Sequence, residues 1–163
     1  MSSHASQASQ ASQASHASPA SATPELELTV VLFNVGSCCA AVEASQIRAT
    51  RPMPAAQADG FMHDIDQTIA YTTAQETLNF PGATGFNLAN APAQLLFIKQ
   101  AQHDHAMQVN TPIEIINLPA SAIHPLPPLL AARCQLRGLR ALALHNAQLI
   151  PLFNLVDLIE AKP

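Results

Sequence analysis

Charged side chains are scarce in this chain. Lys, Arg, Asp and Glu make up 11% of its 163 residues, the net charge is −4, and there is one tyrosine and no tryptophan. Nucleic-acid binding through a basic patch or through base stacking therefore has little support. A glycine-rich phosphate loop, a nucleophile elbow and a His-Glu-x-x-His zinc pattern are also missing. We expect a protein that is not an enzyme and needs no cofactor or metal.

Cysteines and long apolar runs are limited as well. The three cysteines are an odd number, and Cys38 and Cys39 are neighbours that would point to opposite faces of a strand. No window approaches the roughly 18–20 apolar residues of a membrane span. Residues 1–24 lack the basic start and apolar run of a secretory signal. We therefore expect reduced thiols, a cytoplasmic location and no insertion into a membrane.

Residues 4–21 consist of six copies of a triplet of the type Gln7-Ala8-Ser9. The triplets contain no large apolar side chain, so no burial offsets the entropy lost on ordering them. We expect residues 1–24 to be a disordered low-complexity tail, followed by one domain over residues 25–163.

An internal repeat is present in the remaining sequence. Residues 67–78 are echoed by residues 148–159, 81 positions later. In each copy a short apolar strand leads to a helix-capping residue, Thr73 or Asn154, with an acidic residue three positions further on. A weaker echo at an offset of 66 relates residues 32–47 to residues 98–113, matching Ile47 with Ile113. The repeat predicts two similar subdomains.

Runs of aliphatic, β-branched and aromatic residues predict short strands. They lie at residues 26–33, 39–42, 47–50, 95–99, 106–109, 113–116 and 118–123. Gly36-Ser37 and the polar residues 102–105 are predicted hairpin turns, residues 44–46 a tight turn, and the proline-rich residues 124–128 an extended connection. Short strands at this spacing are typical of small β-barrels.

Three pieces of the sequence, taken in order, resemble the CheW-like domain, the coupling module of bacterial chemosensory arrays. They are residues 31–36 with 41–47, residues 118–130, and residues 148–155, and the resemblance covers about residues 26–160. It implies a mainly β fold of two SH3-like five-stranded β-barrel subdomains, with short helices at turns and at the C-terminus. It also implies a non-enzymatic adaptor that couples chemoreceptors to a histidine kinase, in chemotaxis or in type IV pilus twitching motility.

The partners implied by the resemblance are the histidine kinase regulatory domain, the chemoreceptor cytoplasmic tip and other CheW-like modules. Family members often carry Asn-Leu-Arg-Gly before the strand that closes the first barrel. The aligned residues here are His63, Asp64, Ile65 and Asp66, and these four form the predicted partner-binding site. The family's arginine is absent here, and Asp64 and Asp66 stand where relatives place the Leu and Gly that flank it. An aspartate cannot imitate the bidentate hydrogen bonding of a guanidinium group. A divergent member that caps or inhibits the array is therefore the alternative role.

Two further clusters have a more specific interpretation. His103, Asp104 and His105 would place two histidines on one face of a strand, so a metal-dependent enzyme is the alternative from another functional class. A solvated polar hairpin tip is the preferred interpretation, because a metal site needs further ligands at suitable spacing. Arg133, Arg137 and Arg140 would align on a helix. The CheW-like resemblance instead predicts a strand within residues 139–144, which separates them.

Overall fold

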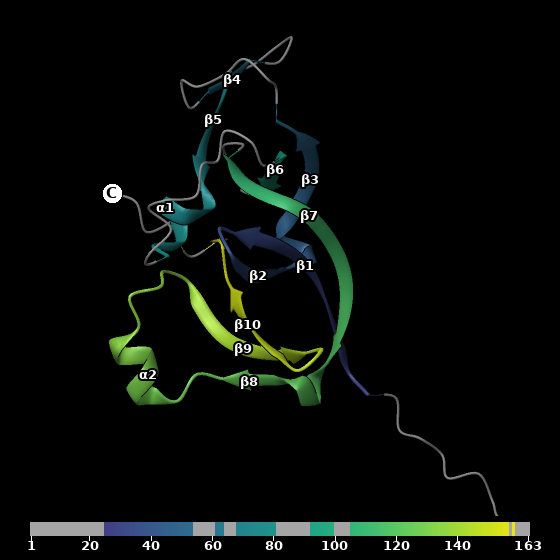
Figure 1. The fold of residues 1–163 in the computed structure, drawn as a ribbon, viewed down its shortest axis with the longest axis vertical. Coiled ribbons are helices and arrows are strands. Elements are labelled where there is room, and N and C mark those ends of the chain that lie inside the picture. Colours follow the sequence, from purple (N-terminus) through teal and green to yellow (C-terminus); the bar gives the residue numbers. More distant parts are fainter. Residues whose placement is uncertain are drawn as a thin grey trace, which may run out of the picture.

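The computed structural model describes residues 25–53, 61–63, 68–80, 92–99, 105–156 and 158. Three sets of residues discussed above lie outside these ranges: the predicted tail at residues 1–24, the predicted partner-binding residues 64–66, and His103 with Asp104. His63 is described by its backbone alone. The strands are β1 (Glu27–Val35), β2 (Cys38–Glu43), β3 (Ile47–Pro52), β4 (Phe61–His63), β5 (Thr68–Thr73), β6 (Ala93–Ile98), β7 (His105–Pro119), β8 (Ile123–Pro125), β9 (Leu139–His145) and β10 (Gln148–Phe153) (Figure 1). Short helical segments lie between them: η1 (Ala44–Gln46), α1 (Ala74–Leu78), η2 (Ala120–Ala122) and α2 (Pro128–Arg133).

The strands pair in the order β3-β6-β7-β1-β2-β10-β9-β8, with β4 on β5 and β5 on β7. Most neighbours are antiparallel, but β5 joins β7 in parallel and β10 joins β2 in parallel. Strand β5 of the first half of the chain thus pairs with β7 of the second half, and β10 of the second half pairs with β2 of the first half. The predicted mainly β fold is confirmed, and its pairing path across the described residues is open. No helix among the described residues is long and apolar enough to cross a membrane.

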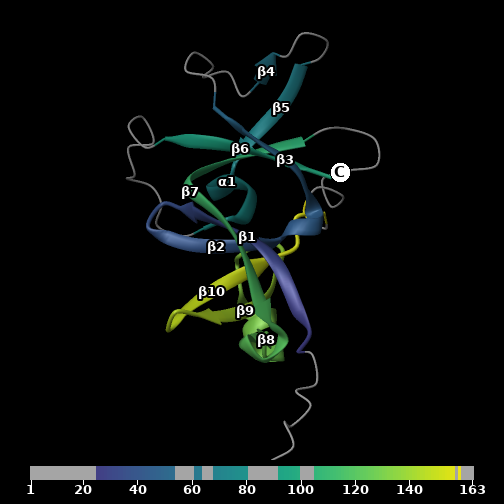
Figure 2. The same cartoon turned by 90° about the vertical axis from the view of Figure 1, so that its right-hand side faces the viewer.

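Strand β1 lies in the middle of the molecule, as Figures 1 and 2 show, and is buried on both faces. Val31 and Phe33 point into one hydrophobic cluster, while Val30 and Leu32 point into another. A continuous apolar run is the pattern expected of a strand covered on both sides. Strand β6 repeats this arrangement, because its Leu96 and Ile98 face the first cluster while its Leu95 and Phe97 face a third. Two sheet layers therefore separate three small cores.

Strand β7 is longer than the sequence predicts. Pro112 was expected to separate two strands, yet the chain stays extended from His105 to Pro119. Pairing with β6 ends at Asn110, and continuous pairing with β1 begins at Glu114, after an irregularity in the register. Pro112 falls in this gap, where its missing N–H is not needed by the ladder. The strand therefore changes partner at the proline and does not end there.

The internal repeat corresponds to matching elements in the two halves. Strands β5 and β10 are the second strands of the hairpins β4–β5 and β9–β10, and each leads into a capped turn. The Thr73 hydroxyl accepts a hydrogen bond from the Glu76 N–H at 3.2 Å, and the Asn154 side chain accepts one from the Val156 N–H at 3.1 Å. The weaker echo is wrong at its end. Ile47 follows the helical turn η1, and its counterpart after η2 is Ile123, whereas Ile113 lies inside β7.

Candidate protein-interaction surface

From Ala141 onward, strand β9 places alanines inward and leucines outward. Ala141 and Ala143 are buried in the cluster that contains Ile150, whereas Leu142 is half-buried and Leu144 is 48% exposed. The inward positions suit small side chains because larger ones from β1, β7 and β10 fill this core at the density of a protein interior. The outward leucines of β9 are therefore not required by the core.

The β9–β10 turn sets two exposed leucines opposite each other. Asn146 and Ala147 have φ values of 50° and 60°, and positive φ at both central positions is the geometry of a tight type I′ hairpin turn. The resulting register pairs Leu144 with Leu149, which is 64% exposed. Directly opposed side chains in an antiparallel pair are within contact distance. The turn thus presents an apolar pair at the end of the hairpin.

The next pair along the hairpin extends this surface. Leu142 lies opposite Pro151 of β10, and both are half-buried. On the other side Leu142 pairs with His124 of β8, which is exposed. Contiguous exposed apolar side chains mark interaction sites more reliably than scattered ones. We refer to Leu142, Leu144, Leu149 and Pro151 as the outer hairpin face.

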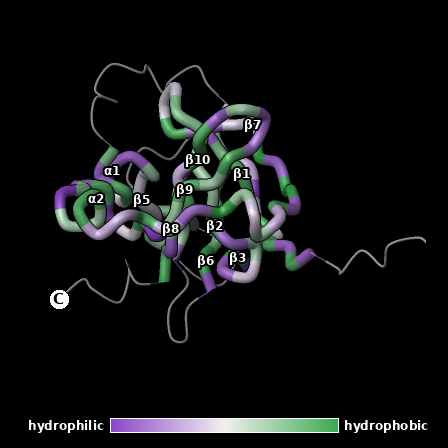
Figure 3. The backbone as a smooth tube through the Cα atoms, turned by 90° about the horizontal axis from the view of Figure 1, so that it is seen from below, coloured by the Kyte–Doolittle hydropathy of each residue, from purple (hydrophilic) through white to green (hydrophobic). Residues whose placement is uncertain are grey.

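Helix α2 buries none of its residues. Leu129 is 78% exposed and Leu130 is 54% exposed, and the helix ends at the exposed Arg133. Figure 3 shows hydrophobic and hydrophilic residues side by side in this helix. The helix was missed in the sequence, where residues 124–128 were interpreted as an extended connection. Pro128 at the first helical turn was the available signal, because proline is favoured at helix starts.

One long segment in the second half of the chain is basic although the whole chain is acidic. Residues 115–156 contain three arginines and no aspartate or glutamate. Arg133 ends α2, Arg137 lies in the following turn and Arg140 is on β9, and all three are exposed. The predicted separation of the three arginines is therefore confirmed. They add positive charge near α2 and near the outer hairpin face.

The predicted site at His63, Asp64, Ile65 and Asp66 falls in the connection between β4 and β5. His63 ends β4, and its backbone pairs with Thr68 of β5. Asp64, Ile65 and Asp66 lie outside the described residues, so their role stays a prediction. The outer hairpin face was not found in the sequence, because the leucines of β9 suggest a buried strand.

His105 is held in a small polar network. Its Nε2 is 3.1 Å from the Thr72 hydroxyl, which is 2.7 Å from the Thr77 hydroxyl. The described part of the chain contains no group of three or more His, Cys, Asp or Glu side chains that could hold a metal ion. His103 and Asp104 lie outside that part, so the metal-binding interpretation of His103, Asp104 and His105 stays a prediction.

All three cysteines are free, and Cys39 is the most shielded of them. Burial raises the pKa of the Cys39 thiol, and the nearby negative charge of Glu114 raises it further. The thiol therefore stays protonated at neutral pH, which is the opposite of what a nucleophilic cysteine needs. Cys39 packs as a small apolar side chain at the edge of the cluster around Ile150.

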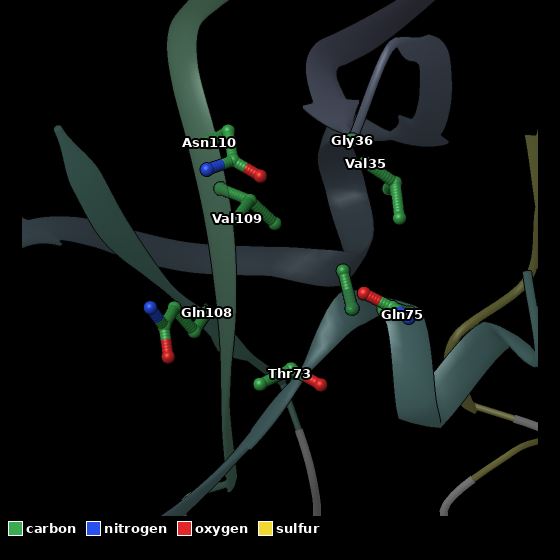
Figure 4. A pocket seen from close by; sticks show the side chains of 8 residues that line it. Val35, Gly36, Thr73, Gln75, Gln108, Val109 and Asn110 are labelled. Atoms are coloured by element: carbon green, nitrogen blue, oxygen red, sulfur yellow. The ribbon is translucent and has the colours of Figure 1, made fainter. Parts of the chain in front are cut away.

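A small depression lies where the β1–β2 turn, the start of α1 and the middle of β7 meet (Figure 4). Its lining consists of Val35, Gly36, Thr73, Ala74, Gln75, Gln108, Val109 and Asn110. These residues offer amide hydrogen bonds and apolar contact but no group that titrates near neutral pH. The depression suits the backbone or side chain of another molecule better than proton transfer chemistry.

Comparison with known proteins identifies the fold. No protein-family model matches this sequence, and no curated protein matches it. Among solved structures, the scaffolding protein TtCheW from Thermoanaerobacter tengcongensis is similar, with a TM-score of 0.62 and 11% sequence identity. The match covers 84% of this chain and 95% of that chain. The protein therefore has a CheW-like fold, as the resemblance implies.

Proposed function

We propose that this protein is a non-enzymatic adaptor of a bacterial chemosensory array. It couples a chemoreceptor cytoplasmic tip to a histidine kinase regulatory domain in the cytoplasm, and other CheW-like modules are further partners. The observation that carries the proposal is a structural likeness that spans 95% of a scaffolding protein. An adaptor needs no chemistry of its own, because holding two partners together raises their effective concentration.

The outer hairpin face supports the proposal, and we assign it to the kinase regulatory domain. Its leucines are exposed without serving the core, and contiguous exposed apolar side chains mark protein-interaction sites. Whether the adaptor serves flagellar chemotaxis or type IV pilus twitching motility depends on which chemoreceptor tip it binds.

The decisive experiment is a calorimetric titration of the full chain with each partner separately. The wild type should bind both the kinase regulatory domain and the receptor tip of its own organism. The double variant Leu144→Ser, Leu149→Ser should bind the kinase domain at least about tenfold more weakly, because the burial of two apolar side chains is lost. Gln148→Ser on the same hairpin is the matched control and should leave the affinity unchanged. Failure of the wild type to bind either partner would refute the adaptor proposal.

A second experiment tests the β4–β5 connection. We expect the pair of acids at Asp64 and Asp66 to weaken binding to a kinase domain that prefers an arginine-bearing adaptor, because mismatched charge at an interface is unfavourable. The triple variant Asp64→Leu, Ile65→Arg, Asp66→Gly should bind more tightly by about tenfold, most clearly at low salt.

The matched control for this experiment is Asp64→Asn, Asp66→Asn, which removes both acids without adding an arginine. A gain in the triple variant alone assigns the effect to the guanidinium, whereas an equal gain in both variants assigns it to charge. Equal affinities of all three proteins at both salt concentrations would remove the connection from the interface.

A further inference from the structure

Helix α2 and the residues on either side of it project from the molecule. Every residue from Pro127 to Gln135 is exposed, and Figure 1 shows the helix at the lower left, apart from the strands. We refer to residues 127–135 as the α2 projection. A helix of six residues that buries nothing is far shorter than the length at which isolated helices become stable in water. Its packing must therefore come from what holds its ends and from what it contacts.

Both ends of the α2 projection are fixed to the body of the protein. Before it, β8 pairs with β9. After it, the Asn79 side chain donates a hydrogen bond to the Gln135 carbonyl at 2.9 Å, and the Arg137 N–H donates one to the Leu78 carbonyl at 3.0 Å. The projection is thus held out on a fixed base, and a binding element that is already in place loses less entropy on binding.

The α2 projection and the turn after it combine apolar and basic side chains. Leu129 is 78% exposed and Leu130 is 54% exposed. Arg133 follows them at helical spacings of four and three, so it lies beside them on the helix surface, and Arg137 adds a second exposed cation. All acidic side chains that the structure describes lie within residues 25–114. The chemistry of the projection therefore complements a surface that is both anionic and apolar.

An anionic lipid surface fits this combination. Leucines enter the boundary between headgroups and acyl chains, while arginines beside them stay at the level of the headgroups. A guanidinium group also matches the geometry of a phosphate through two parallel hydrogen bonds. A fluid bilayer adapts to a convex tip, whereas a protein partner has to offer a groove of matching shape.

We propose that the α2 projection is a peripheral docking site for an anionic lipid surface. Leu129 and Leu130 enter the boundary below the headgroups, and Arg133 and Arg137 bind lipid phosphate groups. Two signals are needed together, because a small apolar insertion or a pair of cations alone gives only weak, reversible binding. The inference does not rest on the adaptor function, because the occupant is lipid and not the kinase or the receptor.

The test is co-sedimentation of the full chain with vesicles of phosphatidylcholine alone or mixed with phosphatidylglycerol. The wild type should bind the mixed vesicles at least about tenfold more tightly, and raising the salt from about 0.05 to about 0.5 M should weaken this binding. Arg133→Gln with Arg137→Gln should remove most of the preference for anionic lipid. Leu129→Ser with Leu130→Ser should bind the mixed vesicles at least about tenfold more weakly. Arg133→Lys with Arg137→Lys keeps the charge and should bind more tightly than the glutamine variant.

Matched variants elsewhere on the surface control for general charge and general stickiness. Arg48→Gln with Lys99→Gln removes the same charge from exposed positions in the first half, and Leu26→Ser with Ile115→Ser removes two other exposed apolar side chains. Both should bind vesicles as the wild type does. Equal binding of the wild type to neutral and anionic vesicles, or equal losses in these controls, would overturn the proposal. A wild type that binds no vesicles, while the α2 variants weaken binding to the kinase domain or the receptor tip, would place a protein on α2 and also overturn it.

Discussion

Replacing Phe153 by alanine is expected to lower the free energy of unfolding by about 3–5 kcal/mol, the cost of truncating a fully buried phenylalanine. Phe153 ends β10, is 1% exposed and pairs in parallel with Val42 of β2. Its ring centroid lies 5.7 Å from that of Phe80, so the substitution also removes an aromatic contact. Phe153 therefore anchors the strand of the second half in the core that both halves share.

The measurement is urea denaturation followed by circular dichroism. Leu149→Ala on the same strand is the matched control, and it should change the free energy of unfolding by no more than about 0.5 kcal/mol because Leu149 is exposed. Phe153→Leu should cost less than Phe153→Ala because it leaves a smaller cavity. A near-neutral result for Phe153→Ala would mean that β10 is not held against β2 as the structure shows.

Truncating Ile69 or Ile150 to alanine should each lower the free energy of unfolding by about 2–5 kcal/mol. The two residues occupy equivalent positions on β5 and β10, and both are buried. They lie in different clusters: Ile150 packs in the one around Val30 and Leu118, and Ile69 in the smaller one around Leu95 and Phe97. The smaller cluster offers Ile69 fewer packing contacts, so we expect the loss of unfolding free energy for Ile69→Ala to lie toward the lower end of this range.

The same denaturation experiment measures both variants, with Gln148→Ala as an exposed control that should be nearly neutral. A severe loss for Ile150→Ala together with no loss for Ile69→Ala would show that the first-half strand β5 does not pack as its counterpart does. Comparable losses would support the equivalence of the two halves.

Local features of the structure were predictable from short stretches of sequence. Gly36 and Ser37 form the turn between β1 and β2, and Gly36 adopts the positive φ that such a turn favours. Thr73 caps α1 as its spacing from Glu76 indicates. These features depend on residues two to four positions apart, so their physical causes are contained in the sequence window that encodes them.

The outward side of β9 could not be predicted in this way. A pattern of alternating alanine and leucine suggests leucines in the core, yet Ala143 is buried and Leu144 is exposed. The choice depends on side chains such as Leu118 and Ile150, which occupy the core from other strands and leave space only for a methyl group. The candidate interaction surface follows from this choice and was therefore invisible in the sequence.

The sequence by itself determined the Gly36-Ser37 turn, the tight turn at residues 44–46, the Thr73 and Asn154 caps, the repeated strand-to-helix plan and the strand of β1. The tertiary structure alone decided that β10 pairs with β2 and β5 with β7, that β7 continues through Pro112, and which leucines face solvent. The physical reason is the range of the interactions. A turn or a cap is stabilised by neighbouring residues, whereas the pairing of Phe153 with Val42 joins distant parts of the chain and depends on the packing of the whole core.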